Sequence, residues 1–414
     1  MAKMKTGAKI GIFALTTCVV IASGFGICKF GFADKGKNPI DKIKEVITTT
    51  SPKENIKTFE VEKEKYYLAI EGKDTLKYTL ETSTGENKIE FTSSDESIVS
   101  VDSNGKLVGK SKGTTTVKLT AYTVEKEVEV LVTDLIEKMP KEEDVKKPLL
   151  YCSSGKSGEK KVCKNYTSEE NDLLDEILKS RVDDAGRGSR AGAVAAARFL
   201  ALEFPYRIPY FSENGRLNKD IKGDGNAYAD GEGRFYHEGL YLNADRKSVL
   251  DPKGIKYGPK PWGQQLYSVP SKGNRPNGLD CSGFITWIIK NGGSESQDRG
   301  AGIHGGVDDM TDLGPKYKLS ERVPKKDLKV GDLLSGGDVP VNGGHIALIA
   351  GITEDKVYVA ECLWSGTGYF GAIIRTYKWD ELQTKGRFYW TVDLDGFYTE
   401  GDGNLTDYWY TEEA

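Results

Sequence analysis

The chain contains 414 residues, of which 29% are charged and 38% hydrophobic, and its formal net charge is −4. This length allows about two or three domains. The composition is typical of a soluble globular protein, and the slight acidity gives no reason to expect a nucleic-acid partner. None of the three histidines, His237, His304 and His345, has the spacing to cysteine or carboxylate residues that zinc sites show. We therefore expect neither a metal nor a cofactor.

The N-terminal segment has the pattern of a membrane anchor. Three lysines in residues 1–9 precede an uncharged run of 19 residues at positions 10–28. About 20 apolar residues span a bilayer, and positive charge before such a run keeps the N-terminus inside the cell. We expect a cytoplasmic tail at 1–9, a single transmembrane anchor at 10–32, and an extracellular remainder. The alternative is a cleaved signal peptide, for which the run is long, and the protein is then secreted.

A polar linker at 33–57 leads into a region of short β-rich runs separated by turns. Several short strands with regular turn signals predict an all-β antiparallel sandwich at 58–134. The turn signals include Asn104-Gly105 and Lys112-Gly113. The predicted strands cover residues 66–70, 76–80, 89–91, 98–101, 115–121 and 128–132.

Residues 93–114, which contain the Asn104-Gly105 turn, closely resemble the bacterial immunoglobulin-like domain of the invasin/intimin type. The resemblance covers most of 58–134. It implies an immunoglobulin-like sandwich that serves as a spacer or an adhesive module on a bacterial surface. A passive spacer is the favoured interpretation, and a carbohydrate- or protein-binding module is the alternative.

A charged connector follows at 135–165, and the chain ends in an acidic tail at 400–414. Cys152 and Cys163 enclose a polar loop within the connector. Outside the cell, two such cysteines usually form a disulfide, so we expect one here, with free thiols as the alternative. The tail has no pattern that indicates a function.

The region 166–399 contains a cysteine at a predicted helix start. The run Asp280-Cys281-Ser282-Gly283 precedes an apolar helical pattern that ends in a glycine signal at 292–293. Asp280 is expected to cap this helix. A thiol at a helix N-terminus lies at the positive end of the macrodipole, which favours its nucleophilic thiolate form. The alternative is a small buried residue that begins a helix. The period of apolar residues also predicts a helix over 191–204.

Two downstream residues could complete a catalytic set with Cys281. His345 follows two glycines and opens an apolar strand, and Glu361 lies on the next strand. A thiol nucleophile needs a base to take its proton, and the imidazole of that base needs a polar partner to hold its orientation. Cys281, His345 and Glu361 could fill these roles. Cys362 should point away from Glu361, and we expect it to be a buried free thiol.

The position of one turn decides whether His345 and Glu361 can meet. A hairpin turn centred on Thr353 places the two residues opposite each other. A turn centred between Glu354 and Asp355 places them on opposite faces of the sheet. The sequence of the turn suits both registers, so this question stays open.

Three motifs together resemble the NlpC-type papain-like cysteine peptidases of bacterial cell walls. They lie at 280–283, 331–333 and 344–347. The resemblance covers about residues 190–395 and implies an α+β papain-like domain with a central antiparallel sheet. It also implies cleavage of amide bonds in peptidoglycan stem peptides without a metal.

The sequence departs from that family in two ways. The family has a tyrosine of the oxyanion site shortly before the cysteine, whereas here Tyr210 is separated from Cys281 by a long segment, and Tyr206 is a rival. The third catalytic residue of the family is often a histidine, whereas here the position offers Glu361. The related amidase–peptidase group with Cys-His-Glu sites implies that a glutamate can serve.

The sequence thus predicts a membrane-anchored extracellular cysteine peptidase that hydrolyses amide bonds in peptidoglycan stem peptides or cross-bridges. Its expected partners are peptidoglycan and, through one helix, the membrane. The first alternative is a surface adhesin or scaffold whose peptidase-like domain binds the wall but is catalytically silent. The second is an acyl-transfer enzyme with the same fold.

Overall fold

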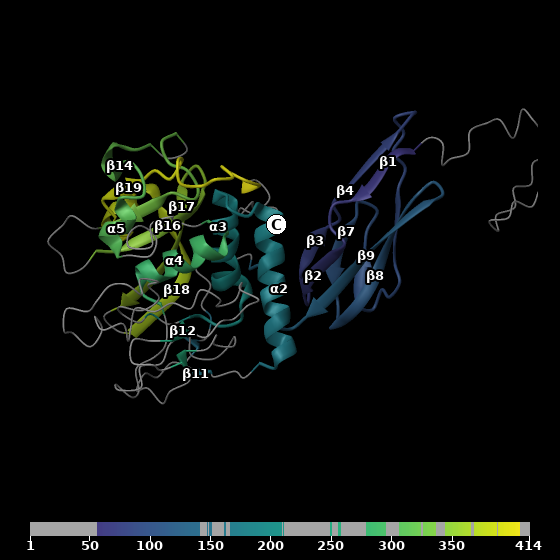
Figure 1. Cartoon of the computed structure of the whole chain (residues 1–414), viewed down its shortest axis with the longest axis horizontal. Coiled ribbons are helices and arrows are strands. Elements are labelled where there is room, and N and C mark those ends of the chain that lie inside the picture. Colours follow the sequence, from purple (N-terminus) through teal and green to yellow (C-terminus); the bar gives the residue numbers. More distant parts are fainter. Residues whose placement is uncertain are drawn as a thin grey trace, which may run out of the picture. The chain divides into compact units, whose positions relative to one another are not determined.

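The structure is a computed structural model of the whole chain (Figure 1). It describes residues 56–140, 147, 149–150, 161–162, 166–208, 210, 249–250, 256–257, 279–294, 306–323, 326–336, 344–365, 368–386 and 388–405. The predicted anchor at 10–32, the predicted disulfide between Cys152 and Cys163, and most of the acidic tail lie outside these residues. Among the helices that are described, none combines the length and the apolar character needed to cross a bilayer.

Nine strands lie in residues 56–133, a stretch that the structure describes without a gap. They form a four-stranded sheet in the order β2-β9-β8-β5, a three-stranded sheet in the order β3-β7-β6, and the pair β1-β4. β2 and β9 are parallel. The strands are β1 (Ile56–Val61), β2 (Lys65–Ala69), β3 (Lys73–Thr75), β4 (Tyr78–Thr82), β5 (Glu90–Ser93), β6 (Val99–Val101), β7 (Lys106–Gly109), β8 (Gly113–Ala121) and β9 (Val124–Thr133).

The predicted sandwich is confirmed, and each of the six predicted strands has a counterpart among these nine. The prediction that it is antiparallel throughout is wrong for one pair, since β2 and β9 run parallel. From Thr115 to Ala121, β8 alternates between buried and half-buried positions, as a strand with one face in a core should. The predicted turn before β7 is also present. Gly105 has a φ of 77°, and the Asp102 carboxylate accepts the N–H groups of Asn104 at 2.8 Å and Lys106 at 2.9 Å.

Helices in the C-terminal part begin at clear sequence signals. Thr167 and Glu170 form a capping box at the start of α2, and the Ser189 side chain caps α3. The helices are α2 (Ser168–Ala185), α3 (Arg190–Arg198), the π-helix η2 (Phe199–Glu203), α4 (Cys281–Asn291), α5 (Val307–Thr311), η5 (Leu319–Glu321), η6 (Trp379–Glu381) and α6 (Leu382–Gly386). The predicted helix at 191–204 is therefore an α-helix that widens into a π-helical turn.

A six-stranded antiparallel sheet forms the other layer of the C-terminal part, in the order β14-β19-β15-β16-β17-β18. The strands are β14 (Lys316–Lys318), β15 (Leu333–Ser335), β16 (Ile346–Ile352), β17 (Lys356–Ser365), β18 (Gly368–Lys378) and β19 (Trp390–Val392). Two short ladders lie elsewhere, β10 (Leu149–Leu150) with β11 (Lys161–Val162) and β12 (Val249–Leu250) with β13 (Lys256–Tyr257).

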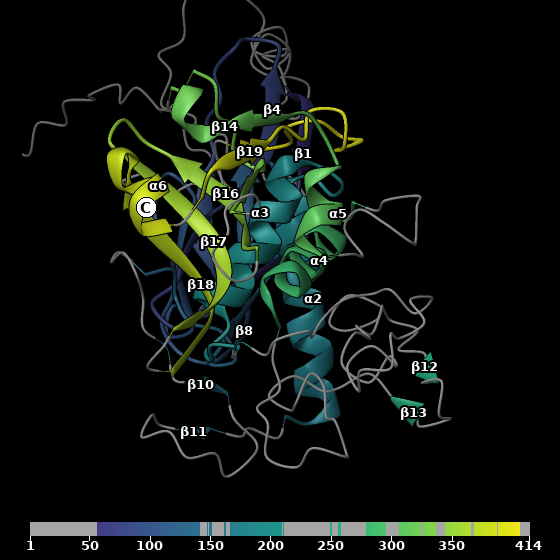
Figure 2. The same cartoon turned by 90° about the vertical axis from the view of Figure 1, so that its left-hand side faces the viewer.

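The two faces of this sheet belong to different hydrophobic clusters. Leu348 and Ala360 pack in a cluster that includes α3 and α4. Their strand neighbours Ile349 and Val359 pack in a second cluster with Phe388. Figure 2 shows α3 and α4 lying together beside β16 and β17. A side chain on β16 or β17 therefore faces either the helices or the second cluster, depending on its place in the alternation.

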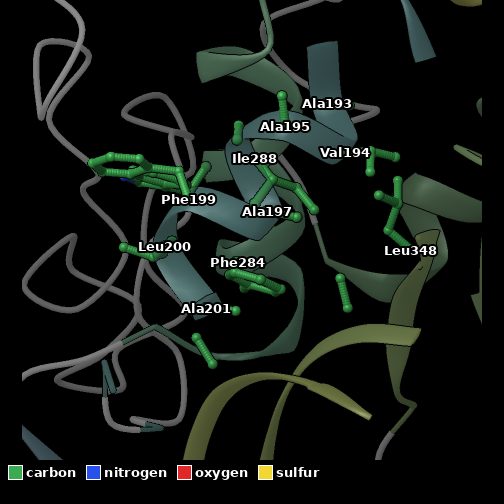
Figure 3. Packing of buried hydrophobic residues seen from close by; sticks show 14 of the residues in the cluster. Ala193, Val194, Ala195, Ala197, Phe199, Leu200, Ala201, Phe284, Ile288 and Leu348 are labelled. Carbon is green, nitrogen blue, oxygen red and sulfur yellow. The ribbon is translucent and has the colours of Figure 1, made fainter. Parts of the chain in front are cut away.

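Close backbone contact joins α3 to the end of α4. A Cβ atom on Gly192 would lie 2.7 Å from the carbonyl oxygen of Gly292, which real side chains do not tolerate. The small residues Ala193 and Ala197 of α3 lie in the same cluster as Ile288 of α4 (Figure 3). Small residues on α3 thus let the helix that begins at Cys281 approach closely.

A buried ion pair fixes α3 to the sheet. Arg190, which is 1% exposed, donates to the Asp332 carboxylate at 2.7 Å, to the Val330 carbonyl at 3.0 Å and to the Asp395 carboxylate at 2.8 Å. Asp332 also accepts the N–H of Leu394 at 3.0 Å. The motif at 331–333 leads directly into β15. Through Asp332 it therefore joins β15 to Arg190, the first residue of α3.

We predict that Arg190→Ala lowers the free energy of unfolding of the C-terminal part by about 3–5 kcal/mol, because the Asp332 charge stays buried without its partner. Urea unfolding followed by tryptophan fluorescence measures this, since all six tryptophans lie after residue 166. The control is Arg187→Ala, which removes an exposed pair with Asp183 and should cost less than about 1 kcal/mol. Equal losses in the two variants would contradict the prediction.

Candidate functional site

Cys281 is the first residue of α4. Its neighbour Asp280 caps the helix, with Oδ1 accepting the Gly283 N–H at 2.6 Å and the Ser282 hydroxyl at 3.1 Å. Cys281 is a free cysteine and is 7% exposed. The cap fixes the first turn, so the thiol is held at the positive end of the helix dipole.

A β-bulge brings His345 and Glu361 to the same face of the sheet. Near the turn, Ile352 pairs with Val357, which corresponds to a turn centred between Glu354 and Asp355. In an uninterrupted ladder this register would place His345 and Glu361 on opposite faces. However, the pairing slips by one residue between Ile349 and Gly351, so that Ala350 is an extra residue in β16.

Beyond the bulge the alternation is reversed. Leu348 now pairs with Ala360, which places Glu361 beside Ala347 and makes His345 its diagonal neighbour on the same face. The two side chains meet there, with 2.8 Å between His345 Nε2 and Glu361 Oε2. Neither of the two simple hairpins considered from the sequence is the observed one.

The Glu361 carboxylate is buried and held on both of its oxygens. His345 takes Oε2, and the Tyr377 hydroxyl donates to Oε1 at 2.7 Å. Phe388 stacks on the His345 ring with 5.6 Å between centroids and an interplanar angle of 24°. The imidazole is therefore fixed by a hydrogen bond at its edge and by a ring against its face. Sequence reasoning missed Tyr377 and Phe388, because the strands and loops that carry them have no local motif.

The electrostatics of the site favour a charged imidazole. Burial alone would lower the pKa of His345, but hydrogen bonding to Cys281 and Glu361, together with their negative charge, raises it from 6.5 to about 10. Since Nε2 faces Glu361, Nδ1 is the ring nitrogen left for an interaction with Cys281. The arrangement can hold an imidazolium beside Cys281.

Tyr210 lies next to the segment that enters α4. It forms an isolated parallel bridge with Leu279, two residues before Cys281, and the preceding Ile208 carbonyl accepts the Ala372 N–H at 2.8 Å. Tyr206 instead packs edge-on against Phe204 with 5.8 Å between ring centroids. The fold thus brings Tyr210 to the neighbourhood of the cysteine despite their separation in sequence.

Cys362 is a buried free thiol, as predicted. Its Sγ donates to the Leu279 carbonyl at 3.1 Å, and burial raises its pKa well above the ordinary value. The bond ties β17 to the backbone just before Cys281. Within the described residues, no group of three or more His, Cys, Asp and Glu side chains could hold a metal ion.

Comparisons with known proteins identify the N-terminal sandwich. No curated protein matches the chain. Among solved structures, domains 4 and 5 of the S-layer protein SbsC show 26% identity over 19% of this chain and 52% of theirs, with a TM-score of 0.17. Domains 5–6 of SbsC show 22% identity over 25% of this chain and 56% of theirs, with a TM-score of 0.18.

A mutant of intimin from EHEC O157:H7 shows 15% identity over 20% of this chain and 52% of its own, with a TM-score of 0.16. The chain thus spans about half the length of each of these three structures. Residues 55–132 match the family of bacterial Ig-like domains (group 2). The chain therefore contains a bacterial Ig-like domain in its N-terminal half.

Proposed function

We propose that the C-terminal part is a papain-like cysteine hydrolase of the NlpC type, which cleaves amide bonds in peptidoglycan stem peptides or cross-bridges. One observation carries the proposal. The imidazole of His345 is bound by the buried Glu361 carboxylate at 2.8 Å, and Cys281, at the start of α4, interacts with the same ring. A nucleophile, a base and an orienting group arranged in this way are typical of thiol hydrolases.

In the proposed reaction, the Cys281 thiolate attacks the carbonyl carbon of the amide. His345 has taken the thiol proton and returns it to the leaving amine, so that an acyl-enzyme forms and the amine departs. Water, activated by the now neutral imidazole, then hydrolyses the thioester. Glu361 keeps Nε2 occupied throughout, which directs Nδ1 toward the sulfur and stabilises the imidazolium.

The oxyanion of the tetrahedral intermediate needs donors near the sulfur. The backbone N–H of Cys281, at the first position of α4, is one candidate, and the Tyr210 hydroxyl is the other. Gly283 cannot serve, because its N–H donates to the Asp280 cap. Removing one such donor typically costs on the order of 3 kcal/mol of transition-state stabilisation.

The proposed setting is the bacterial cell surface. The bacterial Ig-like domain at 55–132 would act as a spacer, and the N-terminal run at 10–32 would anchor the chain with its C-terminal bulk outside. A protein held in this way meets peptidoglycan as its nearest polymer. The substrate proposal rests on this setting together with the resemblance of the three motifs.

A second candidate function is that of a surface adhesin or scaffold with a catalytically silent wall-binding domain. The bacterial Ig-like domain favours this second candidate, because residues 55–132 are the part of the chain that matches a known family. It requires that the Cys281, His345 and Glu361 arrangement does no chemistry. The first experiment below separates the two candidates.

We predict that Cys281→Ala in the full-length protein lowers the release of new amino groups from purified peptidoglycan by on the order of 10⁴-fold or more, because the alanine side chain has no nucleophile to form the acyl-enzyme. Mass spectrometry of the digested muropeptides identifies the bond and distinguishes hydrolysis from acyl transfer. The matched control is Cys362→Ala, a buried thiol outside the proposed set, which should stay active. Undiminished release by Cys281→Ala would remove Cys281 from the mechanism, and an inactive wild type would favour the scaffold.

We predict that Glu361→Gln lowers the pKa of His345 from its value of about 10, because a neutral amide no longer stabilises the imidazolium. In the wild type, this charge stabilises the fold fully below about pH 6.5, and the contribution is lost as the pH rises through about 10. NMR titration of the imidazole measures the pKa directly, and the alkaline limit of activity should shift to lower pH.

The comparison variant is Tyr377→Phe, which removes the hydroxyl from Glu361 but keeps the carboxylate charge. Its effect on the His345 titration should be smaller than that of Glu361→Gln. An unchanged titration in Glu361→Gln would show that the carboxylate does not set the charge of the base.

A further inference from the structure

One edge of the six-stranded sheet carries exposed aromatic and basic side chains. Its outer strand, β14, is exposed at all three of its residues, and β19 lies beside it (Figure 2). Four large hydrophobic side chains are exposed within the described residues, and three of them belong to this edge: Tyr317 at 40%, Val323 at 50% and Tyr389 at 39%. A group of exposed hydrophobic side chains, unlike a single one, is typical of an interaction surface.

The same edge is basic, although the chain as a whole is acidic. Residues 316–327 contain five lysine and arginine residues and two carboxylates, in a chain of net charge −4. Glu321 lies 3.7 Å from Lys318, and the Asp327 carboxylate accepts the Val323 N–H at 3.0 Å. Among the described residues, no carboxylate forms an ion pair with Arg322. The edge therefore presents positive charge that the protein itself does not neutralise.

Arg322 is held against the face of an exposed ring. Its guanidinium carbon lies 3.6 Å from the centre of the Tyr317 ring. Stacking of this kind orders the guanidinium and leaves its N–H donors available for an anion. Lys316 makes a second contact of the same type, with Nζ 5.1 Å from the centre of the Trp390 ring. Cations and aromatic rings thus lie together along the edge.

Lysines on an edge strand also have a simpler explanation, because they prevent the edge from pairing with another strand. That explanation accounts for Lys316 and Lys318, and it makes strand addition by a peptide or a second copy unfavourable. It does not account for Arg322 stacked on Tyr317 or for the exposed ring of Tyr389. The surface therefore suits a ligand that does not bind as a strand.

Strand pairing places this edge near the proposed base. Tyr389 donates its N–H to the Ser335 carbonyl at 2.9 Å, and the next residue, Gly336, donates to the His345 carbonyl at 2.8 Å. Neighbouring strands lie about 4.8 Å apart, so the backbone at Tyr389 is about 10 Å from that at His345. β14 is one strand further out, at about 14 Å. A polymer bound along this edge would pass the site at that distance.

We propose that the edge formed by β14, Arg322 and Tyr389 binds an anionic glycan of the cell surface. The apolar faces of sugar rings pack on the exposed rings of Tyr317 and Tyr389, and the negative groups of the chain bind Arg322 and the lysines. The choice of a glycan over a nucleic acid rests on the proposed extracellular setting. The surface lies outside the proposed catalytic set, and its ligand need not be cleaved.

The test measures binding of the full-length protein to dextran sulfate, an anionic glycan, by calorimetry. Unsulfated dextran tests the sugar alone, and polyglutamate of similar length tests the charge alone. Dextran sulfate should bind most tightly of the three, with an affinity that falls as salt rises. Arg322→Gln should weaken this binding about 5- to 10-fold, as loss of one charge-assisted contact predicts. Tyr389→Ala should weaken binding of dextran sulfate more than binding of polyglutamate, because only the glycan packs on the ring.

The matched control is Arg187→Gln, which removes an exposed arginine that pairs with Asp183 outside this edge. It should leave the affinity for dextran sulfate within about twofold of the wild type. Equal affinities of the wild type and Arg322→Gln would overturn the proposal. Polyglutamate or single-stranded oligothymidylate that binds as tightly as dextran sulfate would overturn it too, because the surface would then recognise charge alone or a nucleic acid.

This experiment is independent of the hydrolase function, because dextran sulfate contains no amide bond. Cys281→Ala should bind dextran sulfate as the wild type does. A failure to bind therefore rejects the glycan surface and leaves the proposed hydrolase standing. An inactive enzyme that still binds dextran sulfate through Arg322 rejects the hydrolase and supports the surface.

Discussion

One extra residue in β16 decides the geometry of the whole site. Strand residues alternate between two faces, and here those faces belong to separate hydrophobic clusters. Without the bulge at Ala350, the hydrophobic residues nearest the turn would keep their places while His345 and Glu361 would face opposite ways. With the bulge, Ile352 and Val357 keep their pairing near the turn, while His345 and Glu361 share one face of the sheet beyond it.

The charges of the site form a set whose members depend on one another. A buried carboxylate is costly unless it is paired, and Glu361 is paired with an imidazolium, a phenol and, more distantly, a guanidinium. The imidazolium in turn is held by the carboxylate and the thiol. Removing one group therefore changes the surroundings of the others, so that single substitutions here test the network rather than an isolated contact.

The sequence predicts those parts of the molecule that local signals specify. The Cys281 helix is one, because its cap, its apolar pattern and its glycine stop lie within residues 280–293. The strands of the Ig-like domain are another, because alternation and turn glycines mark them. The choice of Cys281, His345 and Glu361 as a set could also be made from residue types and their order.

Other parts could not be predicted, because long-range pairing creates them. A bulge is a single added residue, and Ala350 carries no signature of one. Tyr377 and Arg375 reach Glu361 only through the register of β18, and Phe388 only through the packing of a segment before β19. The motif at 331–333 was visible, but its role in binding Arg190 depends on a partner 142 residues away in the chain.

The bridge between Tyr210 and Leu279 makes the site tolerant of variation in chain length. Tyr210 and Leu279 flank a stretch of 68 residues and pair with each other. The two residues that flank the stretch are therefore held together whatever its sequence. Loop-closure entropy grows slowly with length, and closing 68 residues instead of a four-residue turn costs only about 2.5 kcal/mol. Evolution could therefore insert, shorten or exchange a whole module at this point without moving the cysteine or its base.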